Sequence, residues 1–478
     1  MTSFGWLIIL LFSLNQLYFA NGDSYFVNIG QTVVRELSPE FLSIGLDSAM
    51  IRDNFAGINW SKAILLGRNL APAYLRFGGN DADRMWFISV GRSKGKKQNK
   101  VAKANPKNFS MSVRQWDKLN WFVRNVGWKL IFDFNVLIRD SQDRWNPKNA
   151  KKLLSYSQKK KYELGFELGN EPNDFKKWYK HEVTGKMLAL DYRQLKKVLK
   201  NYARYSRSLV IGPSVTQPSK KRRIQYFKDF FKSGGIRSVD VVTFHQYYVN
   251  GRTATLANFT DPEILDELLP EIELMVNLSD HYSGRKNFPL WLGETASAFG
   301  GGAPGLSNTY AGVFMWLDKL GMGALHGLHS IIRQSFYRGH YALLDRNSNP
   351  NPDFWLSVLY KQLVGRKVLT CGTTDKYLRL YCHCGQDKIT VYAINLRKES
   401  VRLTFTNYST ADVKQFLLEP LKGNLQEKAT KLNGKALKFD ELKPDIQFRP
   451  MIVKQPIPLP AHRVAFYVIQ ASNLEFCQ

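Results

Sequence analysis

Acidic side chains are scarce in this chain of 478 residues, which has 40 Asp and Glu against 68 Lys and Arg. The formal net charge is +28, and a charge so far from neutral indicates an anionic partner. Inside a cell that partner would be a nucleic acid, whereas outside it the abundant polyanions are sulfated glycosaminoglycans. The compartment therefore decides how the charge is interpreted.

Long hydrophobic runs are also missing. Beyond the first 22 residues no segment approaches about 18 consecutive apolar residues, so we predict no transmembrane anchor. The mostly apolar stretch from Trp6 to Phe19 is too short for a comfortable span, and Ala20-Asn21-Gly22 offers small residues at the position where signal peptidase cuts. We therefore predict a secretory signal peptide at residues 1–22, although no Lys or Arg precedes the apolar stretch, and a secreted protein that acts outside cells or in lysosomes.

Cysteine is rare and confined to the last quarter of the chain, at Cys371, Cys382, Cys384 and Cys477. The Cys382-X-Cys384 spacing could suggest a metal site, but no His or further Cys pair stands beside it at zinc-ligand spacing. We predict neither a metal nor a cofactor. Export favours disulfides instead. One pairing joins Cys384 to Cys477 and ties the C-terminus to a sheet, and the second then joins Cys371 to Cys382 across a hairpin that turns near Thr374-Asp375.

Five Asn-X-Ser/Thr tripeptides fit an exported glycoprotein, although such tripeptides also arise by chance. They make candidate glycosylation sites of Asn59, Asn108, Asn258, Asn277 and Asn407.

Strand-like and helix-like stretches alternate from about residue 40 to 365. Several strand candidates are near-continuous apolar runs, as expected of buried parallel strands. The candidates are Phe41–Asp47, Ala73–Phe77, Lys129–Asn135, Glu163–Gly169, Ser208–Pro213, Val239–Tyr247, Pro289–Gly293 and Gly327–Gln334. Eight such units predict an α/β fold in which residues 39–365 form a (β/α)8 TIM barrel.

The pattern changes after about Gly365, where short alternating segments are separated by turn residues. These segments are Tyr377–His383, Lys388–Asn395, Ser400–Phe405, Gln447–Val453 and Val464–Ile469. They predict a smaller C-terminal β-sandwich domain over residues 366–478. The strand-like segment Tyr25–Glu36, within residues 23–38, precedes the barrel and is expected to add one or more strands to that sandwich.

Glu171 directly follows the fourth predicted strand, in the run Asn170-Glu171-Pro172. In Glu163–Gly169 the glutamates and glycines share one parity and the large apolar residues share the other, so the small and acidic set should face the barrel axis. Glu171 could also be an ordinary helix N-terminal acid beside a proline. We expect Glu167 to be structural and to hold neighbouring polar groups.

Glu294 ends the seventh predicted strand in the same way, after Pro289-Leu290-Trp291-Leu292-Gly293. The simpler alternative is a salt-bridged acid at a strand end. The C-terminal ends of barrel strands converge on one face, and glycoside hydrolysis needs two carboxylates about one bond. The two glutamates therefore predict a retaining glycosidase.

Other polar residues fall at strand ends on the same predicted face. His245 and Tyr247 lie on the sixth strand, although His245 could be a satisfied core histidine; Arg76, Asp47 and Tyr341 complete the set. A glycine-rich loop, Gly300-Gly301-Gly302, follows Glu294 and offers free N–H groups to a sugar. It lacks the Lys and Ser/Thr of a phosphate loop.

Two basic segments are expected at the rim of that face. Lys220, Lys221, Arg222 and Arg223 follow the fifth strand, and residues 92–107 form a short basic loop after the second. Both could be solvated surface, and four adjacent cations could be a localisation signal, but export removes the nuclear interpretation. We expect them to bind sulfate groups, because several released counterions together make binding tight and salt-dependent.

These residues resemble the animal heparanases, endo-β-glucuronidases that cut heparan sulfate. The likeness covers nearly the whole mature chain and is strongest at residues 168–173, at Tyr248–Thr255, and from Trp291 through Gly302-Ala303-Pro304 to residues 314–321. It implies Glu171 as acid/base and Glu294 as nucleophile, and it supports the Cys384–Cys477 bridge, whereas the Cys371–Cys382 pair looks like an addition. It implies sugar contacts by Asp47, Asn170, Gln217, His245, Tyr247, Arg252, Gly300, Gly301, Gly339 and Tyr341, with Lys107 near the basic rim.

The chain departs from the family pattern at Ala49, Asn80 and Ser219, where the family typically has Asn, Thr and Arg. Family members resemble a precursor whose long linker is cut out, and here that linker shrinks to the basic loop, which predicts a single active chain. The resemblance implies heparan sulfate, heparin and heparan sulfate proteoglycans as partners. The rivals are a non-catalytic heparan-sulfate-binding relative and an exo-β-glucuronidase on small glucuronides. A nucleic-acid binder would explain neither glutamate motif.

Overall fold

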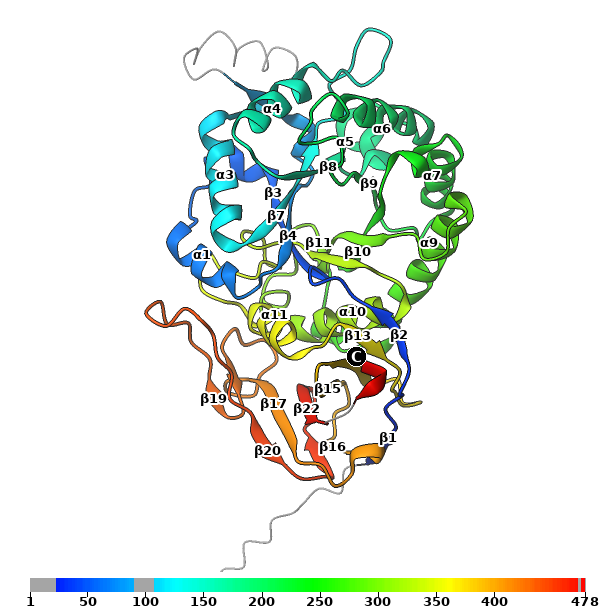
Figure 1. Ribbon diagram of the computed structural model, residues 1–478. Coiled ribbons are helices and arrows are strands. Elements are labelled where there is room, and N and C mark those ends of the chain that lie inside the picture. Colours follow the sequence, from blue (N-terminus) through cyan, green and yellow to red (C-terminus); the bar gives the residue numbers. More distant parts are fainter. Residues whose placement is uncertain (1–22, 90–106, 472–473, 478) are drawn as a thin grey trace, which may run out of the picture.

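The computed structural model describes residues 23–89, 107–471 and 474–477. The predicted signal peptide and nearly all of the predicted basic loop, 92–106, lie outside the described residues. Within them a barrel lies above a smaller all-β domain (Figure 1). No helix in this part of the chain is long and apolar enough to cross a membrane.

Eight parallel strands form the barrel, and the predicted TIM-barrel fold is confirmed. In chain order they are β3 (Leu42–Asp47), β4 (Ala73–Gly78), β7 (Trp128–Phe134), β8 (Leu164–Leu168), β9 (Ile211–Val215), β10 (Val241–Asn250), β11 (Leu290–Phe299) and β12 (Ser330–Arg333). The sheet order is β8-β7-β4-β3-β12-β11-β10-β9. The backbone N–H of Phe166 on β8 donates to the carbonyl of Leu209, 2.9 Å away, and brings the two edges together.

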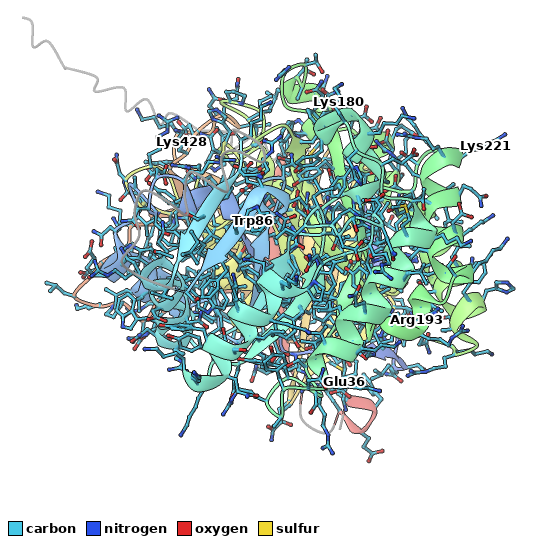
Figure 2. The ribbon with its side chains drawn as sticks, turned by 90° about the horizontal axis from the view of Figure 1, so that it is seen from above. Glu36, Trp86, Lys180, Arg193, Lys221 and Lys428 are labelled. Carbon is cyan, nitrogen blue, oxygen red and sulfur yellow. A yellow bond between two sulfur atoms is a disulfide. The ribbon has the colours of Figure 1, made fainter. Side chains whose placement is uncertain are left out.

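Helices surround the barrel because each strand is followed by an amphipathic crossover whose apolar side packs on the sheet. They are α1 (Trp60–Arg68), α3 (Val113–Val126), α4 (Lys148–Lys159), α5 (Phe175–Tyr179), α6 (Gly185–Leu199), α7 (Lys221–Lys232), α8 (Pro262–Asp266), α9 (Leu268–Ser283), α10 (Gly312–His326) and α11 (Pro352–Leu363). The view from above shows Arg193 on α6 and Lys221 on α7 at the outside of this ring (Figure 2). A parallel pair, β5 (Met85–Ile88) and β6 (Phe109–Ser112), flanks the segment outside the described residues.

The second domain is a β-sandwich, as predicted. Its larger sheet contains β2 (Val33–Glu36), β13 (Lys367–Leu369), β14 (Leu378–Gly385), β15 (Lys388–Asn395), β22 (Arg463–Gln470), β17 (Val413–Pro420), β18 (Thr430–Leu432), β19 (Lys435–Ala436) and β20 (Met451–Val453). The smaller sheet has the order β1 (Ser24–Val27), β16 (Val401–Phe405), β21 (Ile457–Leu459). Apolar side chains of both sheets form one buried cluster between them. The predicted N-terminal contribution is therefore two strands, one in each sheet.

Some strand predictions differ from the structure. The longest unpredicted strand is β17, in which consecutive apolar residues stand between Lys414 and Glu419. The strands β13, β18, β19 and β21 are also unpredicted. Of the segment predicted at 447–453, only Met451–Val453 forms a strand. These short strands are defined by their partners: β18 and β20 pair with β17, β21 pairs with β16, β13 pairs with β2 and β14, and β19 pairs with β18. An isolated sequence of two or three residues has too little pattern to predict a strand.

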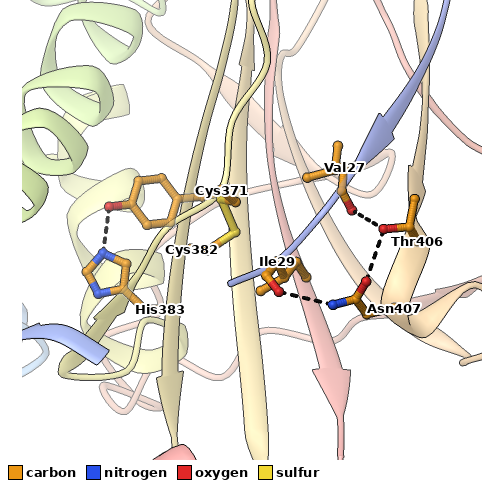
Figure 3. Close-up of a disulfide and its surroundings, with 8 residues drawn as sticks. Val27, Ile29, Cys371, Cys382, His383, Thr406 and Asn407 are labelled. Carbon is orange, nitrogen blue, oxygen red and sulfur yellow. Dashed lines mark hydrogen bonds between the residues drawn. A yellow bond between two sulfur atoms is a disulfide. The ribbon is translucent and has the colours of Figure 1, made fainter. Parts of the chain in front are cut away.

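Both disulfides are present in the structure, Cys371–Cys382 and Cys384–Cys477. The first links β14 to the segment after β13, close to the place where β1 meets β16 (Figure 3). At that place Asn407, a candidate glycosylation residue, donates from its side-chain amide to the carbonyl of Ile29 at 3.2 Å. Asn59, Asn277 and Asn407 are exposed and Asn108 and Asn258 are half-buried, so glycosylation of the five stays a prediction.

Candidate active site

Glu171 and Glu294 meet at the carboxyl-terminal end of the barrel. Glu171 follows β8 and has left-handed backbone geometry, with φ at 53°. Its N–H donates to the carbonyl of Ser214 at 2.9 Å, which fixes this unusual conformation. Glu294 lies within β11, opposite His245 of β10. One carboxylate oxygen of each glutamate and one ring nitrogen of His245 all lie within 4.8 Å of one another. This closeness suits a retaining pair, because inverting enzymes separate their carboxyl groups by roughly 6.5–9.5 Å.

Two hydrogen bonds hold the carboxylate of Glu294. Arg76 donates from Nη1 to Oε2 and Tyr247 donates from its hydroxyl to Oε1, each at 2.7 Å. Burial disfavours the ionised form, but the charges of His245 and Arg76, together with these hydrogen bonds, outweigh it and lower the pKa of Glu294. The group is therefore kept as a carboxylate, the form that a nucleophile requires.

Arg76 lies buried beneath the two glutamates and joins three strand ends. Besides Glu294 it contacts Glu167 from Nε at 2.6 Å and the side-chain oxygen of Asn170 from Nη2 at 2.8 Å. Glu167 is fully buried, so it is structural as expected. Asn170 is also buried, and its amide donates to Asn80 at 3.0 Å. Asn170 therefore positions its neighbours from below and does not line the cleft.

His245 contacts the other glutamate. Its Nδ1 lies 3.1 Å from Oε1 of Glu171, while Nε2 is buried and has no hydrogen-bond partner among the described residues. The alternative of an ordinary core histidine is therefore disfavoured, because this ring contacts a candidate catalytic group. Asp47 faces the same space, and burial raises its pKa to about 6, assisted by the negative charge of Glu294 and opposed by the hydrogen bond from the Ala49 N–H.

The two glutamates line a cleft of about 790 Å³. Twelve predicted site residues line it: Asp47, Glu171, Gln217, Lys220, Arg223, His245, Tyr247, Arg252, Glu294, Gly300, Gly301 and Tyr341. The glycine-rich loop is open here, because side-chain atoms added at Gly300 and Gly301 would meet nothing within 4 Å. The rings of Tyr247 and Tyr341 lie stacked, with centroids 6.3 Å apart.

Five predicted site residues lie outside the cleft lining. Asn170 is buried beneath it, and Gly339 makes room for the ring of Tyr341, which a β-carbon there would approach to 2.7 Å. Lys221 and Arg222 lie in the first turn of α7, where Arg222 contacts Asp174 at 3.0 Å. The carbonyl of Lys107 accepts a hydrogen bond from Arg52 at 2.9 Å.

Sequence reasoning missed two large aromatics that line the cleft. Trp178 on α5 is 52% exposed and Phe299 at the end of β11 is 48% exposed, values that are high for such apolar side chains. Lys177, beside Trp178, brings a further cation to the cleft. The signal was present, since Trp178 and Phe299 each follow a candidate catalytic glutamate within seven residues. Exposed rings in a cleft offer flat apolar surfaces to a ligand.

The geometry also bears on metal binding. Glu171, His245 and Glu294 are the one group of metal-ligand side chains in the described part of the chain whose atoms converge closely enough to hold an ion. Arg76, however, already supplies a positive charge to Glu294 at 2.7 Å. A cation bound by this trio would compete with the guanidinium of Arg76 for Glu294.

Comparison with known proteins places this site in a family. Residues 50–321 match the model described as glycosyl hydrolase family 79, N-terminal domain. The chain is 34% identical over 500 residues to a heparanase of Bos taurus, covering 92% of this chain and 90% of the relative. It is 32% identical over 526 residues to a human protein named inactive heparanase-2, covering 93% and 88%.

A solved structure shares the fold. A 4-O-α-L-rhamnosyl-β-D-glucuronidase of Fusarium oxysporum aligns over 93% of this chain and 99% of its own, with a TM-score of 0.66 at 15% identity. The match of the family model to more than half of the chain, together with the identity to heparanases over nearly all of it, shows that this protein is a member of glycoside hydrolase family 79.

Proposed function

We propose that this chain is a retaining endo-β-glucuronidase that cleaves the bonds between glucuronate and glucosamine in heparan sulfate. The observation that carries the proposal is the approach of one Glu171 oxygen and one Glu294 oxygen to within 4.8 Å at the base of a large open cleft. The similarity to heparanases supports the substrate class. Because a relative at 32% identity is named inactive, the proposal rests on the carboxylate pair rather than on identity alone.

The reaction proceeds in two displacements. Glu171 donates its proton to the leaving glycosidic oxygen while the Glu294 carboxylate attacks the anomeric carbon of glucuronate, and a covalent glycosyl ester forms. Glu171, now ionised, takes a proton from water as that water attacks the same carbon, which releases Glu294 and keeps the anomeric configuration. Tyr247 and Arg76 hold the Glu294 oxygens through both steps.

Cations at the cleft favour an anionic polymer. Lys177, Lys220, Arg223 and Arg252 line it. Their combined positive charge attracts sulfate and carboxylate groups, and binding of such a polymer should weaken as the salt concentration rises. The site departs from the family pattern at Asn80 and Ser219, which both line the cleft, so the preferred sulfation pattern should differ from that of its relatives.

The test is cleavage by Glu294→Gln and Glu171→Gln variants. Each should lose heparan sulfate cleavage by at least a thousandfold yet retain binding to heparin, since neither change removes a cation. Glu267→Gln changes an exposed glutamate between α8 and α9 that does not line the cleft, and it is the matched control. Undiminished cleavage by Glu294→Gln would remove the assignment, and an inactive parent protein that binds heparin would favour the non-catalytic alternative.

The mode of cleavage needs a separate measurement. Gel filtration of a heparan sulfate digest should give fragments of intermediate size early, because a long chain can lie across an open cleft. Early release of single glucuronates with an unshortened polymer would favour the exo-acting alternative. The anomer first released, read by NMR, distinguishes retention from inversion.

We also propose that the protein acts in an oxidising compartment, secreted to the extracellular space or delivered to lysosomes, because its four cysteines form two disulfides. We further propose that it is active as a single chain or is at most nicked within residues 92–107. A reducing gel of the purified active protein tests this, and a requirement for two fragments would contradict it.

A further inference from the structure

One face of α4 is almost entirely lysine. The exposed positions of this helix are Lys148, Lys151, Lys152, Ser155 and Lys159, so every exposed residue except Ser155 carries a positive charge. Lys160 and Lys161 continue the exposed run beyond the helix end. No Asp or Glu occurs between Asp143 and Glu163, so the helix contains no acid that could balance these charges.

The segment after α6 lies against this helix. Tyr202 donates from its hydroxyl to the carbonyl of Lys151 at 3.2 Å, and the N–H of Arg204 donates to the side chain of Gln158 at 3.4 Å. From α3, Arg124 donates to the carbonyl of Lys161 at 3.1 Å. These contacts bring together cations from three segments far apart in the sequence. We name the result the basal cationic patch: Arg124, Lys151, Lys159, Lys160, Lys161, Lys200, Arg204 and Arg207, all exposed.

Acids are few around the patch. Among the described residues, the one patch cation with a carboxylate within 4.0 Å is Lys160, whose Nζ lies 3.7 Å from Asp117. Asp117 also accepts hydrogen bonds from Tyr156 and Tyr162. Two further acids stand near patch residues in the chain: Glu163 follows Tyr162, and Asp240 pairs with Lys196 at 2.9 Å and accepts a hydrogen bond from the N–H of Val210. The patch therefore has a large excess of positive charge. The cations repel one another, and a bound polyanion would reduce that repulsion.

The patch lies at the opposite end of the barrel from the cleft. Lys161 precedes β8, whereas Glu171 follows it, and Arg207 likewise precedes β9. A strand rises about 3.3 Å per residue, so the five residues of β8 place roughly 16 Å of strand between the two ends. None of the eight patch residues lines the cleft. Figure 2 shows Lys180 and Lys221 toward one end of the helices and Arg193, within α6, further toward the other.

We propose that the basal cationic patch is a second binding site for sulfated glycosaminoglycan chains, independent of the active-site cleft. The choice of ligand rests on the proposed function, which places heparan sulfate within reach of this enzyme. Flexible lysines suit an irregular string of sulfates, because each is a point charge that needs no fixed geometry. Binding here gains free energy mainly from released counterions, and a chain long enough to cover the patch gains more than an oligosaccharide that fills the cleft.

The experiment compares two fourfold variants in the Glu294→Gln background. The patch variant carries Lys159→Ser, Lys161→Ser, Arg204→Ser and Arg207→Ser. The matched control carries Lys398→Ser, Lys435→Ser, Lys438→Ser and Lys454→Ser, which removes four exposed sandwich cations that have no ion pair within the described structure. Affinity for long heparin chains is measured over a range of salt concentrations. Each lost contact should reduce the slope of log affinity against log salt concentration by about 0.7–0.9. The slope of the patch variant should therefore be smaller by about 3, and its affinity should be at least tenfold lower.

Three further measurements make the outcome decisive. Affinity for a heparin hexasaccharide should be the same in both variants, and with Glu294 restored both should cleave short chains equally. Equal loss of long-heparin affinity in the patch and control variants would overturn the proposal, as would duplex DNA competing as well as heparin of equal charge. Patch-dependent heparin binding by a protein that cleaves no heparan sulfate would leave the patch standing and reject the proposed function.

Discussion

At the residue scale, the proposed chemistry depends on the two side chains that hold the carboxylate of Glu294. Arg76 and Tyr247 each contact a different oxygen of this carboxylate, and both donors are themselves buried. A hydrogen bond to a charged group is worth about 1.5–3 kcal/mol, more than a neutral one. The arrangement fixes the direction of the carboxylate and keeps it ionised, so the positions of these donors matter as much as the glutamate itself.

Tyr247→Phe should lower kcat/KM by about tenfold or more and move the acid limb of its pH profile to higher pH. The reason is that the hydroxyl helps to lower the pKa of Glu294, so its loss raises that pKa, and activity requires the ionised form. The pH dependence of kcat/KM measures the shift. Tyr248→Phe is the control, because that hydroxyl has no hydrogen-bond partner in the described structure. An acid limb that stays in place in Tyr247→Phe would contradict the role given to this residue.

At the element scale, strands were predicted well where their burial is complete. The barrel strands read as apolar runs, and all eight formed close to the predicted residues. Their ends differ: β10 and β11 continue beyond the predicted ends at Tyr247 and Gly293 to Asn250 and Phe299, and both Asn250 and Phe299 line the cleft. Pairing between β10 and β11 decides where these strands stop, and pairing is not visible in one strand's own sequence.

The short helix α5 brings an unpredicted residue, Trp178, to the cleft. Trp178→Ala should raise KM for heparan sulfate by about tenfold and change kcat less, because about 1–2 kcal/mol of apolar contact with the substrate is lost. Steady-state kinetics on chains of defined length measure the effect. Trp121→Ala on α3 removes an equally exposed tryptophan, 48% against 52%, that does not line the cleft. If both variants behave alike, Trp178 is not a substrate contact.

At the scale of the whole molecule, the barrel and the sandwich share one core. Tyr381 of β14 donates to Asp318 of α10 at 2.7 Å, and Tyr310 donates to the carbonyl of Leu418 on β17 at 2.6 Å. Buried residues of the two domains belong to the same apolar cluster, including Trp316 from the barrel and Phe466 from the sandwich. The sandwich therefore packs against α10, the helix that connects β11 to β12.

The two disulfides should contribute unequally to this assembly. Cys384–Cys477 spans 93 residues and Cys371–Cys382 spans 11, and a longer closed loop restricts the unfolded chain more. Replacing the first pair by serine should cost about 4–5 kcal/mol and replacing the second about 3 kcal/mol. Denaturant unfolding of the two double variants measures the difference. A larger loss from the Cys371–Cys382 pair would show that local contacts, not loop length, dominate.

The sequence by itself determined the barrel and the two glutamates, because apolar runs and acids at strand ends are local patterns. It likewise determined the compartment signals and the excess of positive charge, which follow from the Cys positions and the net charge. Only the tertiary structure decided which groups meet. It placed Arg76 under Glu294, brought Trp178 and Phe299 to the cleft, and moved Lys221 and Arg222 away from its lining. Contacts of this kind join residues from different strands and helices, and their distances depend on how the barrel closes, which no local pattern specifies.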